Sequence, residues 1–326
     1  METQVTLNDV VLMNRPGRRR DAVSLFCSAC TMMAGGIGIS SLNKWIFSSC
    51  RYPYPLFLSS LHMLSAALVN FSLLRAGFVC VGPQKKDEDL PPRVRRQIFG
   101  LSVTFCASIA FGNMGLNYVQ LSFAQTVYAT TPLVTMVMSQ LLLGQEQGWV
   151  RYASMIPVCL GACFSVMGEY EIHKLGCIFV CAATLLRGIK SVQQSVLLQQ
   201  LQMDSIVLLY AMAVPSFFML LSATVLFESR ALWELLTQKD GRLYLFLTLS
   251  CSCAVLYNLA SFYVIQLTSA VTVHVLGNLT AIGNVLISQV LFEGHVTRLS
   301  LAGTTMMLVG MMMYQNSEAL KSKLKI

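Results

Sequence analysis

The chain has 326 residues, of which 55% are hydrophobic and only 12% are charged, about half the charged share of a soluble domain. Too few charges are present to cover a water-facing surface, so an ordinary soluble protein is excluded and a membrane protein is predicted. The net charge of +8 does not indicate a partner nucleic acid, because the cations lie in short clusters between apolar runs and not on one basic face.

Apolar stretches long enough to cross a bilayer follow one another along the whole chain. The expected transmembrane helices cover residues 22–47, 55–78, 97–117, 122–143, 150–168, 175–199, 205–227, 243–266, 269–292 and 297–315. The predicted fold class is therefore an all-α membrane protein of about ten transmembrane helices. Most connections are short, so neighbouring helices are expected to be antiparallel.

The distribution of cations predicts the orientation. With a cytosolic N-terminus, fourteen cations fall in cytosolic segments and six on the opposite side. The cytosolic ones are Arg15, Arg18, Arg19, Arg20, Arg75, Lys85, Lys86, Arg93, Arg95, Arg96, Arg151, Lys321, Lys323 and Lys325. The others are Arg51, Lys174, Arg230, Lys239, Arg242 and Arg298. An even number of spans then places both termini in the cytosol.

The sequence also repeats itself weakly. The segments 122–146 and 269–293 begin 147 residues apart and end in similar strings, Leu-Leu-Leu-Gly-Gln-Glu and Gln-Val-Leu-Phe-Glu. Five helices per half is an odd number, so the halves are expected to be inverted relative to each other, as in many transporters. The predicted division is a tail at 1–21, repeats at 22–168 and 169–315, and a tail at 316–326.

Ionisable groups are costly in hydrocarbon and therefore mark candidate sites. Three cations fall within the expected spans, Lys44, Arg187 and Lys190, and no Asp or Glu lies deep in any span. Arg187 and Lys190 share one helical face with Ser191 and Gln194, which predicts a cavity for an anion. The alternative is that these cations extend along the apolar surface to the membrane interface, as the position of Lys44 near a helix end also allows.

Polar side chains in three other spans are candidates for orienting the solute. They are Gln125 and Tyr128 in the fourth span, Tyr257 and Asn258 in the eighth, and His274 and Asn278 in the ninth. The alternative for the ninth span is hydrogen bonding between helices. No cofactor, metal site or disulfide framework is predicted from the eleven cysteines. No catalytic constellation lies in a span, so an enzyme is not expected.

Several strings together resemble the triose-phosphate and nucleotide-sugar translocators of the drug/metabolite transporter superfamily. They are Ser-Ser-Leu-Asn-Lys-Trp-Ile-Phe ending at Phe47, Gly-Asn-Met-Gly-Leu-Asn-Tyr-Val from Gly112, Leu-Leu-Arg-Gly-Ile-Lys ending at Lys190, Leu-Tyr-Asn-Leu ending at Leu259, and His-Val-Leu-Gly-Asn-Leu-Thr ending at Thr280. The resemblance implies a ten-helix inverted repeat and exchange by alternating access.

The chain departs from that family where phosphate translocators carry cations. Gln125 and Tyr128 replace a His and a Lys, and Thr280 and Ala281 replace a Lys-Arg pair. The resemblance therefore does not specify the solute.

The function predicted from these patterns is an antiporter for a phosphorylated sugar, nucleotide sugar or related organic anion and its counter-substrate. It would act in an endomembrane such as the Golgi. A transporter-like scaffold that moves nothing is the alternative.

Overall fold

The computed structural model describes residues 18–78, 91–116, 118–119, 127–144, 148–166, 174–238, 240–292 and 298–317, and all regular structure in these ranges is helical. The helices are α2 (Arg18–Ser48), α3 (Pro55–Arg75), α4 (Pro92–Leu116), α6 (Thr131–Leu143), α7 (Trp149–Val166), α8 (Lys174–Ser195) with a π-helical turn (Val196–Gln200), α9 (Ser205–Phe227), α10 (Ala231–Thr237), α11 (Gly241–Leu267), α12 (Ala270–Phe292) and α13 (Arg298–Gln315).

Each range expected to span the membrane overlaps one of these helices. By length and apolar composition, six helices in the described ranges can cross a bilayer: residues 23–47, 55–75, 92–115, 174–200, 205–227 and 241–267. Shorter apolar stretches lie at Thr131–Leu143, Ala270–Thr280 and Thr305–Tyr314. The chain is thus a multi-pass, helical membrane protein, and the total of ten crossings stays a prediction. The start of the expected fourth span, with Gln125, lies outside the described residues.

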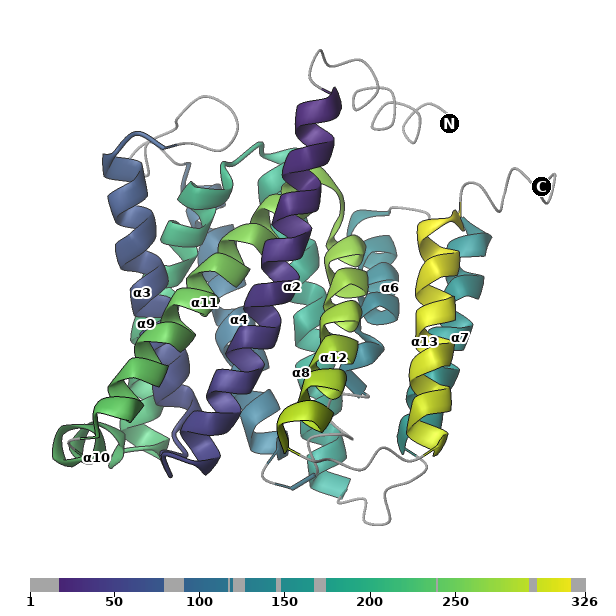
Figure 1. The fold of residues 1–326 in the computed structure, drawn as a ribbon. Coiled ribbons are helices and arrows are strands. Elements are labelled where there is room, and N and C mark those ends of the chain that lie inside the picture. The colour runs from purple at the N-terminus through teal and green to yellow at the C-terminus, as the bar shows by residue number, and fades with distance from the viewer. Residues whose placement is uncertain are drawn as a thin grey trace.

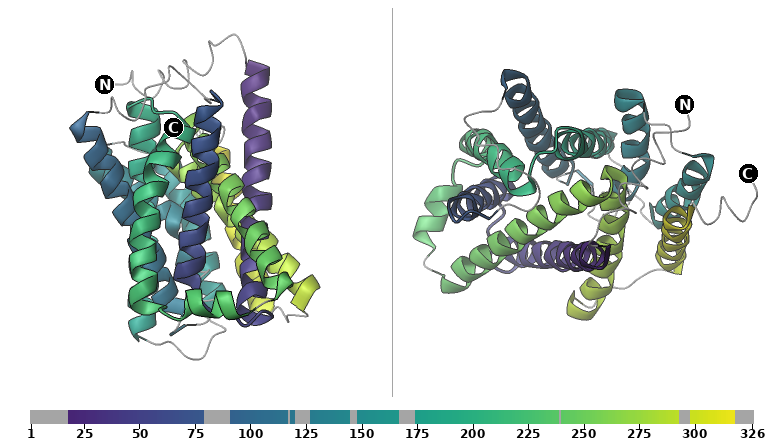
Figure 2. Two further views of the ribbon diagram at one scale, coloured as in Figure 1. Left: turned by 90° about the vertical axis from the view of Figure 1, so that its left-hand side faces the viewer. Right: turned by 90° about the horizontal axis from the view of Figure 1, so that it is seen from above.

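Helices that are distant in the sequence pack in pairs. α2 packs along α11, α3 along α9, α4 along α8, and α7 along α13. Figures 1 and 2 place the α3–α9 pair and α10 at one side of the bundle and the α7–α13 pair at the other. α8 contacts α4, α6, α11 and α12, so it lies in the interior. α2 begins and α13 ends at the same end of the bundle (Figure 1).

Glycine allows the closest of these approaches. A Cβ atom on Gly161 of α7 would lie 2.4 Å from the carbonyl oxygen of Gly303 in α13. A Cβ atom on Gly310 would lie 2.9 Å from the carbonyl oxygen of Ser154. The two backbones are therefore in contact, as in helix pairs of membrane proteins that associate through small residues.

A carboxylate joins α3 to α9 at the end of the bundle where α10 lies (Figure 1). Glu228 directly follows α9, and its Oε1 and Oε2 accept hydrogen bonds from the backbone N–H groups of Leu56 (3.0 Å) and Phe57 (2.9 Å). These N–H groups belong to the first turn of α3 and have no partner within the helix. Nearby, the Tyr52 hydroxyl donates to the carbonyl oxygen of Ala231 (2.8 Å). The carboxylate at the end of α9 thus supplies the hydrogen-bond acceptors for the free N–H groups at the start of α3.

Burial of Glu228 raises the pKa of its carboxyl above the ordinary value, although the two backbone N–H groups act in the opposite direction. A raised native pKa means that the folded protein binds the proton more tightly than the unfolded chain does, so this group adds stability as the pH falls through that interval. We expect the melting temperature of the wild type, relative to Glu228→Gln, to rise as the pH is lowered from 7 towards 4. Thermal melting of both proteins in detergent measures this difference, and a constant difference would contradict it.

Candidate functional site

Arg187 lies at the middle of α8. It is thirteen positions from each end of the 174–200 span, which at 1.5 Å per residue is about 20 Å from either end. This distance exceeds the reach of an arginine side chain, so the geometry disfavours the alternative in which Arg187 extends to the membrane interface. Lys190 lies one turn further along the same face. Both side chains are partly buried.

The guanidinium of Arg187 lies on the ring of Tyr128. The distance from Cζ to the ring centroid is 3.7 Å, a cation–π contact between α8 and the turn before α6. Stacking uses the flat face of the guanidinium and leaves its N–H edges for other acceptors. Among the described residues, no carboxylate pairs with this guanidinium.

Two further groups surround the cations. Lys190 Nζ lies 5.5 Å from the centroid of the Phe105 ring in α4. His274 Nε2 of α12 is hydrogen-bonded to Ser191 Oγ of α8 at 2.7 Å, and it lies within electrostatic range of Lys190 and Arg187. Tyr257 of α11 is within electrostatic range of Arg187 as well. The structure therefore brings five of the predicted site residues into one cluster, which we call the cationic cluster: Tyr128, Arg187, Lys190, Tyr257 and His274.

The remaining candidates divide into three cases. The Asn278 side chain is 7% exposed, and its Nδ2 donates to the carbonyl oxygen of Ala129 (2.9 Å), as expected for a bond between helices. Asn258 is partly buried and has no hydrogen bond within the described part of the chain. Lys44 lies in α2, but its side chain, like the whole of Gln125, lies outside the described residues.

Glycines that the sequence analysis did not select shape the cluster. A Cβ atom on Gly36 of α2 would lie 2.7 Å from Cγ2 of Thr280 and 3.2 Å from the ring of Tyr257. A Cβ atom on Gly112 of α4 would lie 3.1 Å from the Tyr128 hydroxyl oxygen. The sequence feature that could have identified these two glycines is their position inside apolar spans, where glycine permits close packing of helices.

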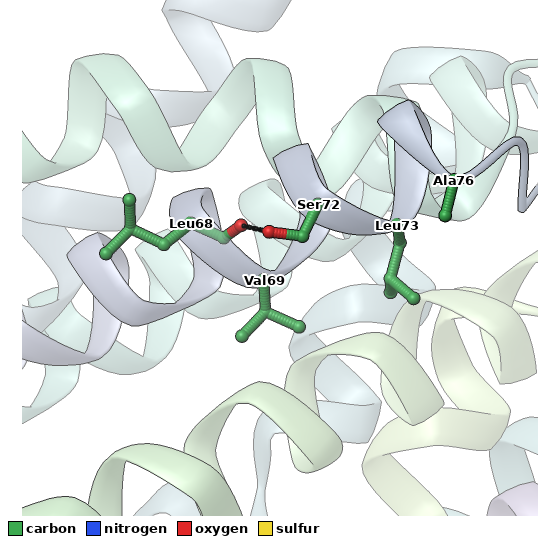
Figure 3. Close-up of a pocket in the computed structure, with 5 residues that line it drawn as sticks. All are labelled: Leu68, Val69, Ser72, Leu73 and Ala76. Atoms are coloured by element: carbon green, nitrogen blue, oxygen red, sulfur yellow. Dashed lines mark hydrogen bonds between the residues drawn. The ribbon is translucent and has the colours of Figure 1, made fainter.

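A shallow groove of about 410 Å³ lies elsewhere, on the C-terminal half of α3 (Figure 3). It is lined by Leu68, Val69, Ser72, Leu73 and Ala76. The Ser72 hydroxyl donates to the Leu68 carbonyl oxygen within the helix, so its proton is not available to a ligand. The groove contains none of the predicted site residues and offers an apolar surface suited to lipid.

The charge pattern of the bundle favours an anionic ligand in the cationic cluster. The acidic side chains with described surroundings lie at helix ends or between helices: Asp204, Glu228, Glu234 and Asp240. Asp204 accepts from the N–H of Ile206, and Asp240 from that of Arg242, so both cap helix N-termini. A solute carrying negative charge would supply the counter-charge that the described part of the interior lacks.

Comparison with known proteins gives a consistent result. The model of the "Triose-phosphate Transporter family" matches residues 31–315. "Solute carrier family 35 member E4" of Homo sapiens is 44% identical over 95% of this chain and 84% of its own length. From Arabidopsis thaliana, a "Probable sugar phosphate/phosphate translocator" is 32% identical, over 87% of this chain and 92% of its own. "UDP-URONIC ACID TRANSPORTER 1" is 30% identical, over 86% and 91%.

A solved structure, described as "Crystal structure of protein", shares the fold. Its TM-score is 0.66 at 13% identity, over 93% of this chain and 99% of that one.

Asn278 and Asn258 should respond differently to the same substitution. Asn278→Leu leaves the buried carbonyl of Ala129 without its donor, which costs about 1–3 kcal/mol of stability. Asn258→Leu removes no hydrogen bond that the described residues make, so its melting temperature should stay near that of the wild type. Thermal melting in detergent compares the two variants, and equal melting temperatures would show that the Asn278 bond does not stabilise the bundle.

Proposed function

Because this chain belongs to the triose-phosphate transporter family, we propose that it is a secondary antiporter for a phosphorylated sugar, nucleotide sugar or related organic anion. The observation that carries the proposal is the pair of cations in the middle of α8, without a carboxylate partner in the described interior. Two relatives are named for sugar phosphate and for UDP-uronic acid, and both of these solutes are anions.

The cationic cluster suits an oxyanion. Arg187, held flat by Tyr128, can present two parallel N–H groups to a phosphate or carboxylate, and Lys190 adds a second charge. Uncompensated charges in a low-dielectric interior are costly, so an anion that neutralises them is bound most favourably where water is excluded. In this proposal, His274, Tyr257 and Asn258 accept hydrogen bonds from the rest of the solute or donate them to it. Lys44 and Gln125 remain candidates from their positions in the sequence.

Helix pairing supports an inverted repeat with halves at 22–168 and 169–315. If α2, α3, α4, α6 and α7 correspond in order to α8, α9, α11, α12 and α13, each of the most extensive helix pairs has its counterpart. The α2–α11 pair corresponds to α8–α4, and α6–α8 corresponds to α12–α2, while α3–α9 and α7–α13 correspond to themselves. Such symmetry suits a mechanism in which one half rocks against the other around a central site. Rocking would expose the cationic cluster to each side in turn.

The proposed setting is an endomembrane, such as the Golgi, with both termini in the cytosol. α2 begins where α13 ends, at the same end of the bundle (Figure 1). The fourteen predicted cytosolic cations, against six on the other side, support the cytosolic assignment of that end.

The central test uses purified full-length protein in liposomes. Vesicles are preloaded with inorganic phosphate, glucose 6-phosphate or UDP-glucose, and uptake of the labelled solute is followed. Exchange of at least one of these solutes is expected. If correctly folded protein exchanges none of a wide panel of sugar phosphates and nucleotide sugars, the scaffold alternative, which the absence of a lysine at Thr280 favours, replaces the antiporter.

Substitution of Arg187 tests the site. Arg187→Ala should weaken the apparent affinity roughly 10- to 100-fold, the value of a hydrogen bond to a charged group. Arg187→Lys keeps the charge but loses the planar fork, so an intermediate value is expected. Arg93→Ala, at an exposed position near the start of α4, is the matched control and should leave exchange unchanged. Wild-type kinetics in Arg187→Ala would remove this residue from the site.

A further inference from the structure

Two buried donor groups, one of them on the ring that contacts Arg187, have no hydrogen-bond partner in the described part of the chain. One is the hydroxyl of Tyr128, a side chain that is 8% exposed. The other is Nδ2 of Asn113 in α4. An unpaired buried donor costs about 1–3 kcal/mol, so a protein seldom retains one without a use for it. Both groups are donors, and an anion requires donors.

Gly112 precedes Asn113 in the chain and lies close to the Tyr128 hydroxyl. A Cβ atom at this position would lie 3.1 Å from the Tyr128 hydroxyl oxygen and 3.9 Å from Nη2 of Arg187. The Tyr128 hydroxyl and the guanidinium edge therefore meet the backbone of α4 at the residue that precedes Asn113. A side chain here would press on the hydroxyl, whereas glycine lets it stay close to the cation.

The direction of Asn113 follows from its neighbours on α4. At about 100° per residue, Asn113 lies on the same face as Ser102 and Cys106. The Ser102 hydroxyl donates to the carbonyl oxygen of Met212, and Cys106 Sγ contacts the carbonyl oxygen of Ser216, both in α9. This face of α4 is thus turned towards α9, about 100° from the face of Gly112, and not towards lipid, where a free amide would be costly.

We propose that Gly112 and Asn113 form one wall of the solute site, where Asn113 Nδ2 and the Tyr128 hydroxyl donate to oxygens of the solute beside Arg187. The ligand class is an oxygen-rich anion, with phosphoryl or hydroxyl oxygens as acceptors. The inference rests on the proposed function and adds to it a wall from the first half of the chain. The cations come from α8, so a solute held in this way contacts both halves at once.

The first experiment adds one methyl group. Gly112→Ala should raise the KM for exchange, because the new Cβ displaces the Tyr128 hydroxyl. Gly100→Ala is the matched control in the same helix, where a Cβ would meet no atom within 4 Å. Both substitutions raise helix propensity by the same amount, so a difference in KM between the two variants is due to the contact of the new Cβ with the Tyr128 hydroxyl. Exchange is measured in liposomes with the panel solute that the wild type exchanges fastest.

The second experiment removes the amide donor. Asn113→Leu should raise the KM roughly 10- to 100-fold, and Asn113→Asp, which has the same shape but repels an anion, at least as much. Asn70→Leu is the control: Asn70 is fully buried in α3, and its unpaired atom is the acceptor Oδ1. If Asn113→Leu does not yield monodisperse protein, Asn113→Ala takes its place.

The outcomes separate the two proposals. A raised KM in Asn113→Leu with a melting temperature that does not fall supports the contact, since a purely structural role would lower stability and leave KM unchanged. A wild-type KM in Asn113→Leu overturns it, whichever way Gly112→Ala behaves, and leaves the antiporter standing. A wild type that exchanges no solute overturns the proposed function itself.

Discussion

The placement of a positive charge at the centre of a membrane-spanning helix is the constraint on which the interior depends. Arg187 is about 20 Å from either end of its span, so water cannot solvate it from the membrane surface. The ring of Tyr128 offers its negative face at 3.7 Å, which offsets part of this cost without neutralising the charge. The remaining charge is available to a ligand. A carboxylate in the same position would stabilise the bundle but would compete with an anionic solute.

Charge is arranged in layers along the bundle. The carboxylates with described partners sit at helix ends, where Glu228, Asp204 and Asp240 accept hydrogen bonds from the free N–H groups of first turns. Two cations, Arg187 and Lys190, lie in the middle, among tyrosines, a histidine and small residues. Anionic side chains thus stabilise helix termini, and the centre keeps an excess of positive charge that no described side chain cancels.

Small residues allow that centre to form. Gly36 lets Tyr257 and Thr280 approach α2, and Gly112 lets the Tyr128 hydroxyl approach α4. At the side of the bundle, Gly161 brings α7 into backbone contact with α13. In lipid, helices gain little from apolar contact alone, so close approach through small residues supplies much of the packing energy. Substitutions at these glycines would therefore affect the site through geometry and not through chemistry.

Hydropathy along the chain was sufficient to locate the helices within a few residues, apart from the start of the fourth span, which lies outside the described residues, because span length follows from the thickness of the bilayer. Helical periodicity likewise placed Arg187, Lys190 and Ser191 on one face. Periodicity could not show that Asn278 bonds the Ala129 carbonyl, or that Nδ2 of Asn113 has no partner among the described residues. Those outcomes depend on which helices lie side by side, and the pairs α4–α8 and α2–α11 join segments far apart in the sequence. The sequence of a single span determines which of its faces is polar. The helix that packs against that face is determined by the tertiary structure, because it comes from a distant part of the sequence.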